Sequence, residues 1–298
     1  MIYPIVVITG ATSGLGQLVA IELAKRGAHL VLTARSKERA ETTKRMLKDI
    51  EPKTELDFFF GDLSLMEDVR RIGKEIKAAY PKIDALVNNA GLHAFEQRIT
   101  SEGFAEMIAV NYLAPWLLTH TLQQSLMKSG NARIVNVASE ASRNHGELKL
   151  PEDLTDTSAF TTRGSSALYG KTKLLNIMFT GELALQLSGT GVTVNALNPG
   201  FNVTGLGREL WFSSALERIL KYLHIGDPRK GADIITRLIL GSQYQGVTGG
   251  YFNVGTGKSI IPAYPGGDIT MQNKLWNETK ELLQRRGFVE RINIYKEE

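Results

Sequence analysis

Residues 5–16 decide the fold and read Ile-Val-Val-Ile-Thr-Gly-Ala-Thr-Ser-Gly-Leu-Gly. The first four are β-branched and apolar, as expected for a strand buried on both faces of a parallel sheet. The glycine-rich turn leads into a helical pattern that runs to about Arg26 and stops at Gly27. A strand, a glycine-rich turn and a helix in this order aim backbone N–H groups at a pyrophosphate. The glycine spacing here is GxxxGxG rather than the commoner GxGxxG.

The same alternation of strand and helix continues through the chain. Ser64, which comes after the predicted strand at 55–60, can cap the helix that follows it. Further strands are predicted at 30–33, 55–60, 83–87, 133–138 and 192–197, and helices at about 38–50, 101–127 and 168–187. This pattern predicts an α/β fold, a doubly wound parallel sheet of the Rossmann type with helices on both faces. No repeat or linker interrupts it, so residues 1–298 are predicted to form a single domain.

The end of the second predicted strand indicates which nucleotide is bound. An acidic residue there would bind the ribose 2′-OH of NAD, whereas an arginine accommodates the 2′-phosphate of NADP. The sequence has Arg35 and no acid at this position. A charge-assisted hydrogen bond to phosphate is worth about 1.5–3 kcal/mol. We therefore expect NADP(H), preferred by roughly ten- to a hundredfold.

Composition excludes several other classes of protein. The net charge of +4 is small for 298 residues, which argues against nucleic-acid binding. The chain has no cysteine, so disulfides and thiolate chemistry are excluded, and its five histidines are not spaced as metal ligands. No apolar run reaches membrane-spanning length, and Met1 leads almost directly into a strand. We expect a cytoplasmic protein without a bound metal.

Tyr169 and Lys173 stand four residues apart in an apolar helical pattern, so their side chains lie on one helix face. A lysine charge about 5 Å away, at an effective dielectric of about 20, favours the phenolate by about 3 kcal/mol. That corresponds to a pKa lowered by about 2 units, which suits acid–base chemistry near neutral pH. The spacing YxxxK is common by chance, so its weight depends on the motifs around it.

Taken together, these motifs resemble the short-chain dehydrogenase/reductase family, in its NADP-preferring form. The resemblance runs from about Ile5 to Phe252, with each motif in the expected order. It implies a cofactor site built from the TGxxxGxG loop, an adenine-lining pair, the NNAG turn and a PGxxxT segment. The residues concerned are Gly10, Ser13, Gly14, Leu15, Gly16, Arg35, Asp62, Leu63, Asn89, Ala90, Gly91, Pro199, Gly200 and Thr204, with Tyr169 and Lys173.

The resemblance also implies a catalytic tetrad of Asn111, Ser139, Tyr169 and Lys173. Tyr169 would exchange a proton with the substrate oxygen, and Lys173 would lower its pKa and hold the nicotinamide ribose. Ser139 would hydrogen-bond the substrate oxygen as charge develops on it. Asn111 would hold a water that links Lys173 to solvent. The implied activity is NADP(H)-dependent interconversion of a carbonyl and an alcohol.

The long gap between Ser139 and Tyr169 is typical of the retinol-dehydrogenase-like branch. Pro151-Glu152-Asp153-Leu154 and Gly249-Gly250-Tyr251-Phe252 resemble that branch too, as does the tail from Asp268 to Leu283 with Leu275-Trp276. This tail belongs to a C-terminal extension expected at about 255–298. An apolar stripe at about 206–225 follows Thr204 and is predicted to be a lid over a bulky lipophilic substrate, or else a packing surface. A homodimer is left open.

Two other functions are compatible with the same motifs. One is a C=C reductase of the protochlorophyllide-oxidoreductase kind, which the absence of cysteine disfavours because that enzyme is expected to use one as a proton donor. The other is an NADP-binding redox sensor without turnover. Such sensors usually lose the tyrosine or the lysine, whereas this chain keeps both.

Overall fold

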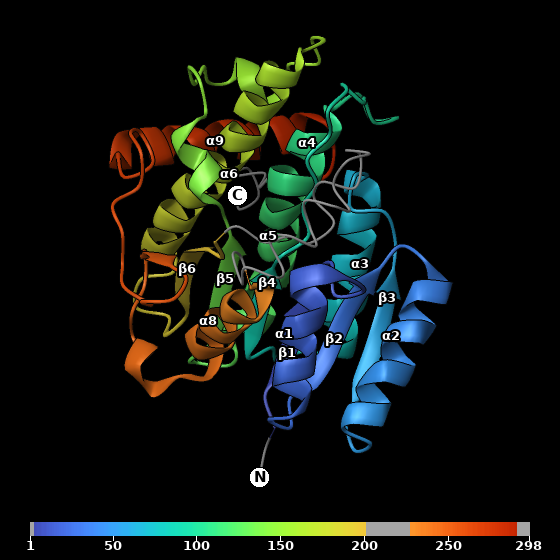
Figure 1. The fold of residues 1–298 in the computed structure, drawn as a ribbon. Helices are drawn as coiled ribbons and strands as arrows, with labels where there is room; N and C mark the ends of the chain where they lie inside the picture. Colours follow the sequence, from blue (N-terminus) through green and yellow to red (C-terminus); the bar gives the residue numbers. More distant parts are fainter. Residues whose placement is uncertain (1–2, 201–226, 291–298) are drawn as a thin grey trace, which may run out of the picture.

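The computed structural model describes residues 3–200 and 227–290, apart from the side chains of residues 162 and 163. Within these residues, one sheet of seven parallel strands has the order β3-β2-β1-β4-β5-β6-β7 (Figure 1). The strands are β1 Ile5–Ile8, β2 His29–Ala34, β3 Leu56–Phe60, β4 Ala85–Asn88, β5 Arg133–Val137, β6 Thr193–Asn198 and β7 Tyr251–Asn253. The strand order reverses between β1 and β4, which opens a crevice at their carboxyl ends.

Helices cover both faces of this sheet (Figure 1). One face packs against α1 Gly14–Ala24, α2 Lys37–Ile50 and α8 Pro228–Leu240. The other face packs against α3 Met66–Ala79, α5 Ala114–Met127 and α6 Thr162–Gln186, and α9 Ile269–Arg285 packs on α6. The predicted doubly wound α/β fold is therefore confirmed.

The central strand shows why the sequence reads as a continuous apolar run. Val6 and Ile8 belong to the core under α1 and α8, whereas Val7 belongs to the core on the opposite face. All three side chains are fully buried. Because successive side chains of a strand point to opposite faces, a sheet covered on both sides needs an apolar residue at every position.

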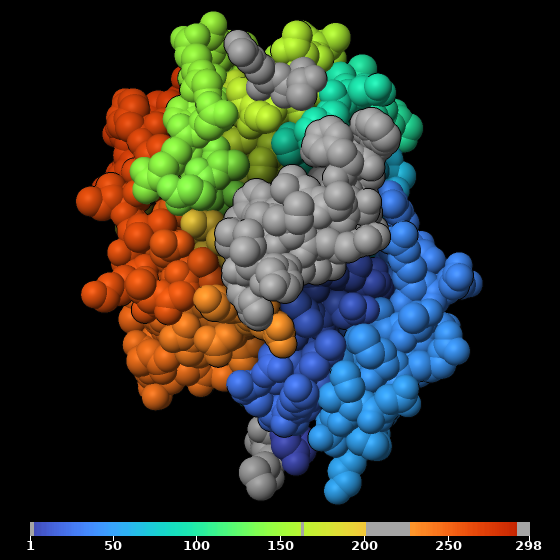
Figure 2. Space-filling view, viewed as in Figure 1, coloured from blue at the N-terminus to red at the C-terminus, as the bar shows by residue number. Residues whose placement is uncertain are grey.

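Helix α8 joins the C-terminal part of the chain to its beginning. It packs against α1, and Figure 2 shows this orange segment in contact with the blue N-terminal elements on one face of the molecule. The contact is close at Gly231, where a Cβ would lie 3.1 Å from Leu15 Cδ1 and 3.2 Å from Pro199 O. The start of α8 therefore lies beside both the glycine-rich turn and the segment that follows β6.

The predicted helix at 101–127 is wrong in its start and its regularity. Residues 100–104 form a turn with Gly103 at φ 79°, and helix begins only at α4, Glu106–Ile108. A π-helical turn, Ala109–Leu113, then separates α4 from α5. Pro115 supplies the physical reason, because it has no N–H to donate to the carbonyl of Asn111 four residues earlier. The helix widens at that point and leaves the Asn111 carbonyl free for another donor.

Candidate active site

The glycine-rich turn after β1 has a shape that only glycines allow. Gly10 and Gly14 have φ values of 68° and 55°, in the left-handed region. A Cβ on Gly16 would lie 2.4 Å from Asn89 Nδ2 and 2.5 Å from Gly10 O, well inside contact distance. The chain can therefore turn tightly before Ser13, the N-cap of α1, and present the start of that helix to the crevice.

The NNAG turn after β4 is pinned to this glycine-rich turn. Thr9 Oγ1 accepts hydrogen bonds from the backbone N–H groups of Asn89 and Ala90, both at 3.0 Å. The Asn89 side chain returns a hydrogen bond from Nδ2 to Thr9 O at 2.9 Å. Two motifs about eighty residues apart in the chain thus form one rigid rim at the point where the strand order reverses.

Arg35 and Asp62 meet at the ends of the neighbouring strands β2 and β3. Arg35 Nη1 lies 3.6 Å from Asp62 Oδ2, and the Arg35 side chain is 72% exposed. The Asp62 backbone is fixed by a hydrogen bond from its N–H to Asp68 Oδ2 at 2.7 Å. Leu63 packs at the margin of the core. The three residues expected at the adenosine end of the cofactor therefore lie together.

Ser139 and Tyr169 are brought together by a close crossing of α6 over the turn that follows β5. The Ser139 hydroxyl hydrogen-bonds Tyr169 and also accepts from Ala141 N at 3.2 Å. The crossing occurs at Gly170, where a Cβ would lie 2.4 Å from Ala141 O and 2.5 Å from Asn144 O. Gly170 is a residue that the sequence reasoning missed, and its signal was a glycine inside a helical pattern next to Tyr169.

Lys173 is buried one helical turn after Tyr169. Its Nζ donates to Val137 O at 2.9 Å and lies 5.6 Å from the centroid of the Tyr169 ring. Burial lowers the pKa of Lys173 to about 8. A Cβ on Gly91 would lie 3.3 Å from Lys173 Nζ, so the last residue of the NNAG turn leaves room for the ammonium group.

The prediction that the pKa of Tyr169 is lowered is wrong. Burial raises the pKa of Tyr169 to about 12, and the hydrogen bond with Ser139 opposes this rise only in part. The Lys173 ammonium faces the Val137 carbonyl rather than the phenol oxygen. Desolvation of the phenolate is thus the larger effect, and the phenol stays protonated through neutral pH.

Asn111 lies in the π-helical turn and is fully buried. Its side chain makes two hydrogen bonds with the Leu92 backbone, both at 2.8 Å, and donates to Thr172 Oγ1 at 3.0 Å. Its backbone carbonyl, which Pro115 leaves free, accepts from Asn176 Nδ2 at 2.8 Å. Asn111 therefore ties the segment after Gly91 to α6, and Asn176 is a partner that the sequence reasoning missed.

Pro199 and Gly200 follow β6 at the same edge of the sheet. Gly200 has φ 76°, and its N–H donates to Asn198 Oδ1 at 3.1 Å. Thr204 and the predicted lid at 206–225 lie outside the described residues.

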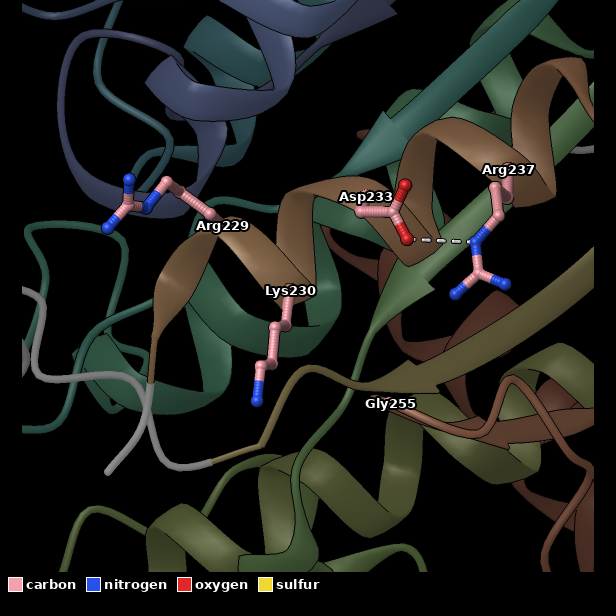
Figure 3. A pocket seen from close by; sticks show the side chains of 5 residues that line it. All are labelled: Arg229, Lys230, Asp233, Arg237 and Gly255. Carbon is pink, nitrogen blue, oxygen red and sulfur yellow. Dashed lines mark ion pairs between the residues drawn. The ribbon is translucent and has the colours of Figure 1, made fainter. Parts of the chain in front are cut away.

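A cavity of about 430 Å³ opens beside the start of α8. It is lined by Arg229, Lys230, Asp233, Arg237 and Gly255 (Figure 3). Figure 3 shows the Asp233 carboxylate paired with the Arg237 guanidinium, at 2.9 Å. Its lining contains none of the residues that the sequence predicts for catalysis or cofactor binding. The reaction site is therefore located by its side chains and not by this cavity.

The residues at the crevice fit a nicotinamide dinucleotide. Gly10, Gly14 and Gly16 leave a cradle without side chains at the start of α1, where backbone N–H groups favour a pyrophosphate. Ser139 follows β5, Tyr169 and Lys173 belong to α6, and Lys173 Nζ lies beside Gly91 of the same rim. A buried phenol, a hydroxyl and an ammonium group thus lie next to this cradle, and these are groups that can take part in proton transfer.

Comparisons with known proteins agree with this site. Residues 4–150 match the short chain dehydrogenase family. Human retinol dehydrogenase 13 is 32% identical over 93% of this chain and 84% of its own length. Retinol dehydrogenase 14 of Mus musculus is 33% identical over 91% of this chain and 83% of its own length.

A solved structure of actinorhodin polyketide ketoreductase with NADPH superposes with a TM-score of 0.66. It is 26% identical and covers 85% of this chain and 95% of its own. The helices of the described residues include none that is long and apolar enough to cross a bilayer. The chain belongs to the short-chain dehydrogenase/reductase family, in its retinol-dehydrogenase-like branch, and is a nicotinamide-dependent oxidoreductase that interconverts carbonyls and alcohols.

Proposed function

We propose that this protein reduces the carbonyl group of a bulky lipophilic substrate with NADPH, using Tyr169 as the proton donor. The observation that carries the proposal is the group formed by Tyr169, Ser139 and Lys173 beside the glycine-rich cradle. A phenol with a pKa of about 12 holds its proton through neutral pH, which suits donation better than abstraction. This favours reduction over oxidation.

Each residue has one task in the proposed mechanism. When bound, the nicotinamide supplies the hydride to the carbonyl carbon. Tyr169 Oη donates its proton to the carbonyl oxygen, and the Ser139 hydroxyl stabilises the charge that develops there. Lys173 places a positive charge near the phenol and stabilises it as the proton leaves. Asn111 holds the segment after Gly91 in place on α6.

We infer a preference for NADP(H) from Arg35. The pair that it forms with Asp62 is long and exposed, and such pairs contribute about 0–1 kcal/mol. A hydrogen bond from arginine to a 2′-phosphate is worth about 1.5–3 kcal/mol, so exchanging the carboxylate for the phosphate is favourable. Arg35→Ala should lose most of the preference for NADPH over NADH in binding assays. Arg45→Ala, at an exposed arginine further along α2, is the matched control.

The lipophilic substrate is inferred from the predicted lid at 206–225 and from the retinol dehydrogenases among the relatives. We also infer that 255–298 is an extension of the same single domain, since α9 packs on α6.

A panel of aldehydes and ketones of increasing apolar size, assayed by NADPH absorbance with Tyr169→Phe as the blank, tests the activity. Phe212→Ser with Leu216→Ser should raise KM for the largest carbonyl more than for the smallest. Equal increases would show that the segment is not a lid.

A further inference from the structure

An aromatic ring that the mechanism does not use lies directly on the catalytic tyrosine. The His93 and Tyr169 rings stack with their centroids 4.7 Å apart and their planes 17° from parallel. Phe95 contacts the same histidine, with ring centroids 4.6 Å apart. His93 lies two residues after the NNAG turn, so the rim that holds the cofactor cradle also brings this ring to Tyr169.

The orientation of the His93 ring is set by a serine of the catalytic helix. His93 Nε2 lies 2.8 Å from Ser165 Oγ. Ser165 Oγ in turn donates its one proton to Ala94 O at 2.6 Å. A carbonyl oxygen can only accept, so the serine hydroxyl is an acceptor towards His93, and Nε2 must carry the proton.

Ser165 is a firm anchor for this ring. It is fully buried, and it lies one turn before Tyr169 on α6, on the same helix face. Ser165 and Tyr169 therefore move together. The His93 ring, which is hydrogen-bonded to Ser165, keeps its position against the Tyr169 ring. A phenol has two rotatable side-chain bonds, and an aromatic ring stacked on it restricts the tilt of its plane.

From this geometry we propose that His93 is a positioning residue for Tyr169. Its ring, held by Ser165, fixes the plane of the phenol so that Oη points at the oxygen of the bound carbonyl. The inference rests on the proposed role of Tyr169 as the proton donor. The stacked ring orients the phenol, whereas the proton on His93 Nε2 only holds the ring against Ser165.

Three variants separate the stack from the hydrogen bond. His93→Ala removes both, His93→Gln keeps an N–H donor for Ser165 without a ring, and His93→Phe keeps a flat ring without the donor. Ser165 retains its hydrogen bond to Ala94 O in all three, so none leaves a buried hydroxyl proton unpaired. The assay is reduction of the carbonyl that the panel above shows to be turned over fastest, together with NADPH binding.

We expect kcat to fall about 10- to 100-fold in His93→Ala and His93→Gln, with KM and NADPH affinity nearly unchanged, because a misaimed donor slows the proton transfer alone. His93→Phe should restore most of kcat. If kcat is unchanged in both His93→Ala and His93→Gln, or if Gln rescues and Phe does not, the stack does not position Tyr169.

Tyr169→Phe in the same assay separates this inference from the proposed function. An inactive Tyr169→Phe beside fully active His93 variants would refute only the positioning role. An active Tyr169→Phe would refute the proposed function itself.

Discussion

At the scale of single residues, the site holds two ionisable groups whose pKa values burial moves apart. Burial raises the pKa of Tyr169 to about 12 and lowers that of Lys173 to about 8. In both cases the charged form is the one that burial disfavours. Near neutral pH the phenol is therefore protonated while the lysine still carries most of its charge.

This arrangement predicts how carbonyl reduction depends on pH. Because the pKa of Lys173 is lowered from 10.5 to about 8, its charge is lost as the pH rises through about 8. The rate of reduction should be steady from about pH 6 to 7.5 and fall above pH 8, while Tyr169 remains protonated. A profile of kcat/KM with saturating NADPH measures this. A rate that still increases above pH 9 would contradict the assignment.

The buried lysine should also make the native state less stable. The folded-state pKa is below the unfolded value, so the penalty is fully present below pH 8 and is relieved as the pH rises from 8 to 10.5. A shift from 10.5 to about 8 corresponds to about 3 kcal/mol. Lys173→Met should therefore raise the free energy of unfolding by about 1–3 kcal/mol at pH 7, less at pH 10, and abolish turnover.

Lys171 is the matched control for this prediction. It lies on the same helix two residues earlier and pairs with Asp153 at 2.6 Å, with both side chains mostly buried. Lys171→Met leaves that carboxylate without its partner, so it should lower the stability by about 1–3 kcal/mol. Urea unfolding at pH 7 compares the two variants. If both variants have a lower free energy of unfolding, the charge of Lys173 does not destabilise the native state.

At the scale of elements, α6 organises the site because three segments are attached to it. The turn after β5 crosses it at Gly170, and the Asp153 carboxylate of the following insert binds Lys171. Asn176 holds the π-helical turn through the Asn111 carbonyl. The Pro151–Leu154 motif thus has a structural role, which is to fasten the insert to the helix that carries Tyr169 and Lys173.

Gly170→Ala tests this organisation. Its Cβ would meet two backbone carbonyl oxygens at 2.4 and 2.5 Å, and backbone cannot move aside as a flexible side chain can. We expect a loss of about 1–3 kcal/mol in stability and a larger loss in kcat than in NADPH affinity, since Ser139 is displaced from Tyr169. Gly267→Ala is the control, at a glycine outside the left-handed region where the nearest atom to the added Cβ, Pro262 Cγ, lies at an ordinary contact distance of 3.5 Å. A Gly170→Ala variant with normal kcat would show that the close crossing is not needed.

The elements also show where prediction from sequence succeeds and where it fails. Five of the first six strands follow from apolar runs that contain Val, Ile or Leu, because strands buried on both faces tolerate little else. The other, β3, follows from an aromatic run and is only partly buried. Ser64 is not a helix cap, because the Glu102 carboxylate binds the first N–H groups of α3 at Met66 and Glu67, at 2.6 and 3.0 Å. A cap that comes from about 35 residues away has no local signal.

At the scale of the whole molecule, the site is assembled from strand ends that the topology places at one edge of the sheet. Residue types and motif order were enough to predict this gathering. The raised Tyr169 pKa and the His93 stack were not predictable, since both depend on the burial and orientation of groups that meet only in the fold. Spacing along a helix gives the distance between two side chains, but not the environment around them.

Tyr169→Phe shows whether Tyr169 is the proton donor in carbonyl reduction. This change removes one oxygen and keeps the ring that stacks on His93, so the fold and the NADPH dissociation constant should stay close to those of the unaltered protein. We expect kcat for carbonyl reduction to fall by about 100- to 10,000-fold, because the variant has lost its general acid. If a Tyr169→Phe variant binds NADPH normally and reduces the same carbonyl at an undiminished rate, Tyr169 is not the proton donor.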